Sequence, residues 1–179
     1  MRVFLQGIRA ADLSLFKARR FKRGGGPGKY AATFHVEPGS AAEKALLDAM
    51  HQVAAHKWGD AATEKLWTAH SNGNLAFRTT DAMEQDDGTT RVQPILRAYN
   101  AEQPLVVNRD RSLVDERQSP IYPGCYVNAF VDVWASDARD TVRIGATLEG
   151  VQFEADGRPL VTRERAADDA GKNDDEAAT

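Results

Sequence analysis

Apolar and polar residues alternate with a period of two along Tyr122–Trp134, which predicts a β-strand. One face carries only small apolar side chains, those of Cys125, Val127, Ala129, Val131 and Val133. The opposite face carries Tyr126, Asn128, Phe130, Asp132 and Trp134. Three rings separated by hydrogen-bonding groups can stack flat ligands, whereas a strand buried on both sides would hide the same rings under a helix. From this strand alone the buried arrangement is the simpler interpretation.

A helix is predicted over residues 40–58. Ser40 and Glu43 have the capping-box spacing, in which both side chains satisfy backbone N–H groups at a helix start. Gly59 is a suitable stop. The apolar positions recur at helical spacing at Leu46, Leu47, Met50, Val53 and Ala54.

The rest of the chain is typical of short strands joined by turns. Val3–Phe16 predicts a strand bent near Gly7, and Lys29–Glu37 predicts its hairpin partner. Further expected elements are strands at Val92–Ala98, Leu105–Val107 and Thr141–Phe153 (with a bulge near Gly150), a short helix at Ala61–Ala69, and turns at Asn72-Gly73, Asp137–Asp140 and Asp156-Gly157. We therefore predict a mainly β fold, a small antiparallel barrel of the oligonucleotide-binding (OB) type, over residues 1–161.

Composition is consistent with one domain, since 42% of the residues are hydrophobic and 27% are charged. No apolar run approaches the ~18 residues of a membrane span, and the N-terminus does not resemble a signal peptide. Cys125 is the single cysteine, so an internal disulfide is excluded. These features predict a cytoplasmic protein without a membrane partner.

The formal net charge of -3 is unevenly distributed. Residues 1–34 contain eight Lys or Arg residues and one Asp, so this head can attract phosphates. Residues 162–179 are predicted to be a disordered tail, which can compete for the same surface or bind a basic partner. Its acidic residues are Asp168, Asp169, Asp174, Asp175 and Glu176. A solvated loop and a frayed terminus are the plainer interpretations of the two charged segments.

Aromatic rings interleave with the cations of the basic head between residues 16 and 30. Guanidinium and ammonium groups can hold phosphates while rings stack bases, and glycines allow the loop to move. The residues are Phe16, Lys17, Arg19, Arg20, Phe21, Lys22, Arg23, Lys29 and Tyr30.

Catalytic and metal signatures are weak. Gly24–Lys29 resembles a phosphate-binding loop, but no Ser or Thr follows the lysine and a strand is expected next. The histidines lack ligand spacing, and one cysteine cannot form a zinc finger. The acidic group Glu84, Asp86 and Asp87 could bind magnesium but is more typical of a solvated loop. The sequence thus favours a protein that is not an enzyme and needs no metal or cofactor.

Several segments resemble a bacteriophage family once described as a domain of unknown function, whose members are single-stranded DNA-binding proteins with an OB barrel. Ile121–Phe130, with its Tyr-Pro-Gly-Cys-Tyr motif, is the most specific match. The others are Lys29–Val36, Lys57-Trp-Gly59, Gly150–Phe153 and Asp156–Leu160. The resemblance covers most of residues 1–161, and the long run Gly24–Gly28 departs from it.

The resemblance implies sequence-independent binding of single-stranded DNA in phage replication, recombination or repair, inside the bacterial host. It also implies that the tail recruits phage or host replication proteins, and homo-oligomers are left open. Phosphate contacts are expected from Arg9, Lys17, Arg19, Arg20, Lys22, Arg23, Lys29 and Arg97, and base contacts from Tyr30, Tyr99, Tyr126, Asn128, Phe130 and Trp134. Two alternatives remain at this point, a metal-dependent phage nuclease and a protein-interaction module that binds no DNA.

Overall fold

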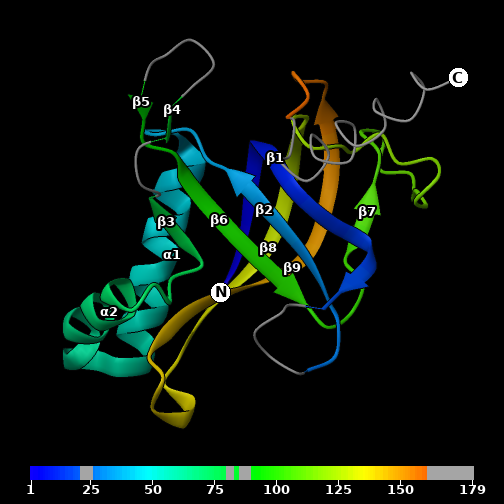
Figure 1. Ribbon diagram of the computed structural model, residues 1–179. Coiled ribbons are helices and arrows are strands. Elements are labelled where there is room, and N and C mark those ends of the chain that lie inside the picture. Colours follow the sequence, from blue (N-terminus) through cyan, green and yellow to red (C-terminus); the bar gives the residue numbers. More distant parts are fainter. Residues whose placement is uncertain (21–25, 80–82, 85–89, 161–179) are drawn as a thin grey trace, which may run out of the picture.

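The computed structural model describes residues 1–20, 26–79, 83–84 and 90–160, in which a β-barrel is flanked by two helices (Figure 1). The barrel strands follow the order β6–β2–β1–β8–β9, and a parallel pairing of β6 with β9 closes the ring. The elements are β1 (Arg2–Arg19), β2 (Lys29–His35), α1 (Ala41–Trp58), η1 (Gly59–Ala61), α2 (Ala62–Ser71), β3 (Phe77–Thr79), β4 (Met83–Glu84), β5 (Thr90–Arg91), β6 (Pro94–Asn100), β7 (Leu105–Val107), β8 (Tyr126–Ser136), η2 (Ala138–Asp140) and β9 (Arg143–Ala155).

The long strand β1 pairs with two different strands because it bends at Gly7. Its first half pairs with β8 and its second half with β2. Gly7 has a φ of 63°, a conformation that side chains with a Cβ rarely adopt, and the ladder to β8 shifts register beside it. The side chain of Asn128 accepts a hydrogen bond from the Gly7 N–H at 3.0 Å. The bend predicted near Gly7 is therefore confirmed.

Helix α1 begins and ends where the sequence predicts. The Glu43 N–H donates to the Ser40 hydroxyl at 3.2 Å, and the Gly39 N–H donates to the Glu43 carboxylate at 2.7 Å. Gly59, with a φ of 54°, forms the C-cap. The helix packs on β1 and β8, where Leu46 and Met50 are buried.

The core consists of the inward residues of the barrel strands together with the buried face of α1. On β8 this inward face is the small apolar series that the sequence predicts, and every member is buried. The opposite face of β8 is open at Tyr126 and Phe130, which are 40% and 43% exposed, while Asn128 between them is 5% exposed. The fully buried interpretation of this strand is therefore wrong. Within the described ranges, no helix is long and apolar enough to cross a membrane.

The mainly β, OB-like barrel is confirmed, and so is the bulge of β9 near Gly150. One predicted turn is wrong, because the chain does not reverse at Asp156-Gly157. The Tyr122 hydroxyl instead accepts the Gly157 N–H at 3.1 Å, which holds this segment extended beside residues 122–124. The expected tail, 162–179, lies outside the described residues, so the division of the chain at residue 161 stays a prediction.

The two faces of β8 and β9 should differ sharply in their tolerance of truncation. Leu148→Ala, in the fully buried core, is expected to lower the free energy of unfolding by about 2–5 kcal/mol because it leaves a cavity. Phe130→Ala, on the open face, should cost about 1 kcal/mol, mainly the contact of its ring with Phe4. Urea denaturation of both variants measures the difference, and equal losses would place Phe130 in the core.

Candidate nucleic-acid interface

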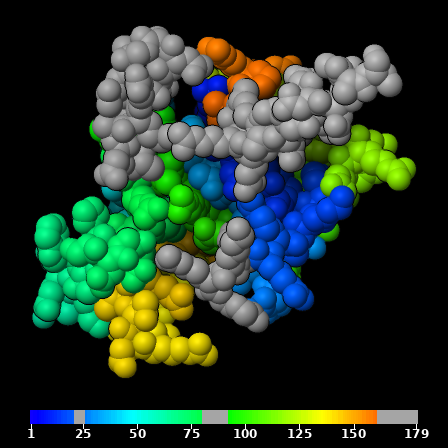
Figure 2. Space-filling model, viewed as in Figure 1, coloured from blue at the N-terminus to red at the C-terminus, as the bar shows by residue number. Residues whose placement is uncertain are grey.

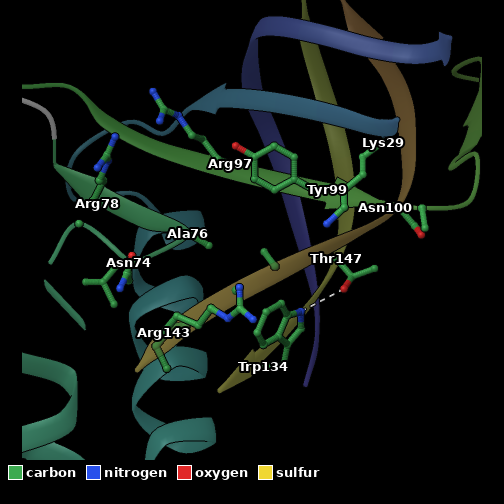
Figure 3. Close-up of a pocket in the computed structure, with 16 residues that line it drawn as sticks. Lys29, Asn74, Ala76, Arg78, Arg97, Tyr99, Asn100, Trp134, Arg143 and Thr147 are labelled. Carbon is green, nitrogen blue, oxygen red and sulfur yellow. Dashed lines mark hydrogen bonds between the residues drawn. The ribbon is translucent and has the colours of Figure 1, made fainter. Parts of the chain in front are cut away.

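A groove of about 430 Å³ lies on the outside of the barrel, where β6 pairs with β9 beside the end of β8 (Figure 3). Period-two alternation on β6 points Arg97 and Tyr99 outward, since Leu96 and Ala98 are buried. The loop before β3 forms another wall. The polar and aromatic lining residues are Lys29, Asn74, Arg78, Arg97, Tyr99, Asn100, Trp134, Arg143 and Thr147.

The groove concentrates positive charge. Four cations line it, from Lys29, Arg78, Arg97 and Arg143, and none of the described lining residues is acidic. Within the described part of the chain, none of these four forms an ion pair with a carboxylate. Cations without an internal partner can neutralise the phosphates of a ligand at no cost of breaking a salt bridge.

Two aromatic rings lie among these cations. The Trp134 ring packs over Gly145, where an added Cβ would come within 2.2 Å of its Cζ2 atom. The Trp134 Nε1 donates to the Thr147 hydroxyl at 3.1 Å, and the Arg143 guanidinium lies 5.7 Å from the ring centroid. Tyr99 is 38% exposed and lies in register with Thr147. Both rings thus line a groove that also contains four cationic side chains.

The turn between β8 and β9 is anchored to the helices by Asp137. Its carboxylate accepts hydrogen bonds from the Lys65 ammonium at 2.7 Å and the Trp58 Nε1 at 3.2 Å. In Figure 2 the residues of this turn project beside those of α2. The hydrogen bond from Lys65 is the largest cause that lowers the pKa of Asp137, and Lys57 and Trp58 act in the same direction against burial. Asp137 therefore fixes the turn that connects Trp134 at the end of β8 with Arg143 at the start of β9.

One side of the groove, formed by Lys29 of β2 with Arg97 and Tyr99 of β6, belongs to the strand pair on which OB barrels bind oligonucleotides. In that fold the ligand lies on the face of the second and third strands, between the first connecting loop and the last. Here the second and third barrel strands are β2 and β6, and the two connections are residues 20–28 and 137–142.

Four residues proposed from the sequence come together in this groove. Lys29 lies at the start of β2, Arg97 and Tyr99 project from β6, and Trp134 lies near the end of β8. They come from three segments that are far apart in the chain, so the barrel, and no local motif, assembles them.

The other outward residues of β8 lie away from the groove. At about 3.3 Å per residue, Phe130 is about 13 Å and Tyr126 about 26 Å from Trp134 along the strand. Asn128 is 5% exposed, and its amide donates to Gln152 and Glu154 while accepting from Gly7. Because the Asn128 amide hydrogen-bonds these three residues of the barrel, we do not assign it a contact with a base. Tyr30 is half-buried at the start of β2.

Three of the cations proposed from the basic head interact with other parts of the protein. Arg9 donates to the carbonyls of Gly124 and Arg158, Lys17 pairs with Glu116 at 3.0 Å, and Arg19 pairs with Asp12 at 2.7 Å. Arg20 is exposed. Lys22, Arg23 and the acidic residues of the tail lie outside the described residues.

Four further lining residues, Arg78, Arg143, Asn74 and Thr147, are not expected from the sequence. Arg78 belongs to the part of the chain between the helices and β6, whose pattern is weak. A signal for Arg143 was present, because the outward positions 143, 145 and 147 of β9 read Arg-Gly-Thr beside an aromatic strand. That signal depends on knowing which strand pairs with β8.

Among the described residues, no group of three or more His, Cys, Asp or Glu side chains is arranged to hold a metal ion. The acidic group considered for magnesium contains Asp86 and Asp87, which lie outside the described residues. Burial raises the pKa of the Cys125 thiol, and the same side chain is fully buried in the core.

A protein-family model described as Enterobacter phage Enc34, ssDNA-binding protein, matches residues 1–179. A curated relative, protein p50 of Acyrthosiphon pisum secondary endosymbiont phage 1, is 32% identical over 161 residues, which cover 88% of this chain and 85% of the relative.

Solved structures share the fold. The single-stranded DNA-binding protein of bacteriophage Enc34, in complex with single-stranded DNA, superposes with a TM-score of 0.70 at 18% identity, covering 89% of each chain. The single-stranded DNA-binding protein gp2.5 of bacteriophage T7 superposes with a TM-score of 0.57 at 12% identity, covering 99% of each. At these identities the two likenesses establish a common barrel.

The effect of Asp137→Asn on the melting temperature should depend on pH. Because the folded protein lowers the pKa of Asp137, this carboxylate stabilises the fold above the unfolded pKa of about 4. That contribution is lost as the pH falls through the lowered folded value. The melting temperature of the variant should therefore fall below that of the unsubstituted protein at pH ~7 and converge with it at pH ~2–3. Asp140→Asn, in the same turn, is the control, and a pH-independent difference would contradict the assignment.

Proposed function

This chain belongs to the family of the Enterobacter phage Enc34 ssDNA-binding protein, and from this membership we propose that it binds single-stranded DNA in the groove between β6, β9 and the end of β8. Binding is independent of base sequence, because the groove offers rings and cations in place of an array of base-reading groups. The protein coats single strands during phage replication, recombination or repair, in the cytoplasm of the bacterial host.

One observation carries the proposal: four cations that form no ion pair with any described residue line one groove with two aromatic rings, and none of the described lining residues is acidic. Cations elsewhere on the described surface, such as Lys17 and Arg19, are paired with carboxylates. In a protein with a formal net charge of -3, this separation attracts a polyanion to one place. Phosphates would lie against Arg97, Arg78, Arg143 and Lys29, while bases stack on Tyr99 and Trp134.

The basic segment of residues 20–28 begins and ends close to elements of the barrel. It leaves β1 after Arg19 and returns at Lys29, which lines the groove itself. Arg20, Lys22 and Arg23 would therefore add phosphate contacts when the loop lies along the DNA. Binding involves no catalysis, metal or cofactor, and a nuclease activity that consumes DNA in the presence of magnesium would contradict this.

The acidic tail has two roles in the proposal. Its carboxylates occupy the positively charged groove when no DNA is bound, so DNA must displace them to bind. They also recruit basic surfaces of phage or host replication proteins. Both roles follow from the opposite charges of the tail and the groove.

The aromatic contacts can be tested with matched pairs. Tyr99→Ala should weaken binding to oligo-dT by about 1–3 kcal/mol, the value of one lost stack. Tyr126→Ala, with nearly the same exposure but far from the groove, should leave affinity unchanged. Trp134→Leu should likewise weaken binding, whereas Trp67→Leu, on the outside of α2, should not. Fluorescence anisotropy measures each affinity. A loss for Tyr126→Ala equal to that for Tyr99→Ala would mean that bases run along β8 instead.

The phosphate contacts predict a change in salt dependence. Each neutralised phosphate of a single strand contributes roughly 0.7 to the slope of log K against log salt. Arg78→Ala combined with Arg97→Ala should therefore flatten the slope by about 1.4 for every DNA sequence. The control combines Lys44→Ala and Arg117→Ala, two exposed cations outside the groove. An unchanged slope in the first variant would place the phosphates elsewhere.

Removal of residues 166–179 should tighten binding to single-stranded DNA, most strongly at low salt where charges are weakly screened. A full-length variant with the five acidic residues changed to Asn or Gln should behave in the same way, which separates charge from length. Titrations at about 0.05 and 0.3 M salt measure the effect. Equal or weaker affinity after deletion would leave the tail only the recruitment of partners.

A further inference from the structure

A straight apolar row crosses the outer surface of the barrel away from the groove. Phe4 of β1 lies in register with Phe130 of β8, which lies in register with Gly150 of β9, and Gly150 with Leu105 of β7. We call these four residues the apolar row. Phe4 is 49%, Phe130 43% and Leu105 56% exposed. None of them lines the groove.

The side chains of the apolar row contact one another on the surface. The Phe4 and Phe130 rings contact each other with centroids 4.8 Å apart. At Gly150 an added Cβ would lie 3.4 Å from the Leu105 Cβ and 3.7 Å from the Phe130 Cδ2. The glycine thus lets the Phe130 ring and the Leu105 side chain lie close to each other across β9. An exposed apolar centre of this kind, four strands wide, is typical of a contact surface.

The charges around the row favour a protein over a nucleic acid. Three ion pairs border it: the Met1 ammonium with Asp132 at 2.6 Å, Arg2 with Glu149 at 3.3 Å, and Arg109 with Glu154 at 4.0 Å. The rim therefore carries as many negative as positive groups, whereas a phosphate backbone requires an excess of cations. An apolar centre with a polar rim is the usual composition of a protein interface.

We propose that the apolar row is the surface through which two copies of this chain associate. A two-fold axis that crosses the middle of the row at right angles to it would place Phe4 of one copy against Leu105 of the other, and Phe130 against Gly150. The same rotation brings the opposite charges of the rim together, so Arg2 of one copy can exchange its partner for Glu149 of the second. Exposed ion pairs are weak, so such an exchange costs little.

The contact leaves both grooves accessible, because the row and the groove share no residue. The apolar row alone is small compared with the roughly 800 Å² per partner of a standard interface, so we expect a weak dimer. Association of two copies does not depend on DNA binding, so it can first be measured without DNA.

Sedimentation velocity of the full chain over a range of concentrations, about 1–500 μM, is the first test. Buffer with about 0.5 M salt suppresses association between the acidic tail and the basic loop while an apolar contact persists. The average mass should rise from one chain toward two. A mass that stays at one chain throughout would overturn the proposal.

Leu105→Arg should abolish this rise, because it places a charged side chain without a partner against the apolar residues of the second copy. The matched control is Leu47→Arg, the same change at a 43% exposed leucine of α1 outside the row. Both sites are exposed, so both variants should keep the circular dichroism spectrum of the folded protein. Identical association of the two variants would exclude the row as the interface.

A second comparison distinguishes DNA from protein as the occupant. Binding of oligo-dT by dilute, monomeric protein should be the same for Leu105→Arg and Leu47→Arg. If the row stacked bases, Phe4→Ala would weaken that binding at a concentration where no dimer exists, and the self-association proposal would be wrong. Failure of all DNA binding with intact dimerisation would instead contradict only the proposed function.

Discussion

The closure of the barrel between β6 and β9 is the constraint on which the groove depends. One parallel contact, Tyr99 with Thr147, joins strands that belong to distant parts of the chain. Because outward residues alternate along both strands, closure places Arg97 and Tyr99 beside Arg143 and Thr147 on one surface. Without this contact the cations would lie on two separate edges, and no groove would exist between them.

Two glycines of β9 decide how the aromatic residues of β8 are used. Trp134 packs down over Gly145, and Phe130 lies beside Gly150, since neither position has a side chain to lift the ring away from the sheet. The first arrangement forms part of a positively charged groove, and the second forms part of an electrically balanced apolar row. One strand face therefore contributes to two surfaces of different chemistry.

Local charge, more than total charge, governs what this protein attracts. A net charge of -3 alone predicts little affinity for DNA, yet four cations without carboxylate partners lie together in the described structure. Many of the remaining cations are held in ion pairs that consume their charge locally. The anchor at Asp137 adds rigidity, because it ties the β8–β9 turn to both helices at the edge of this charged region. A groove held in place before binding loses less entropy when a ligand enters.

The sequence by itself determined the local features. Period-two alternation identified the inward face of β8, the Ser40 and Glu43 cap placed the start of α1, and Gly7 marked the bend of β1, since each depends only on neighbouring residues. Tertiary structure alone decided which open residues meet. The barrel curves, so Trp134 joins Arg97 and Arg143 while Tyr126, on the same strand face, lies about 26 Å away. Long-range pairing also decided which cations remain without partners, because the carboxylates that neutralise Lys17 and Arg19 are chosen by the fold and leave no periodic trace in the chain.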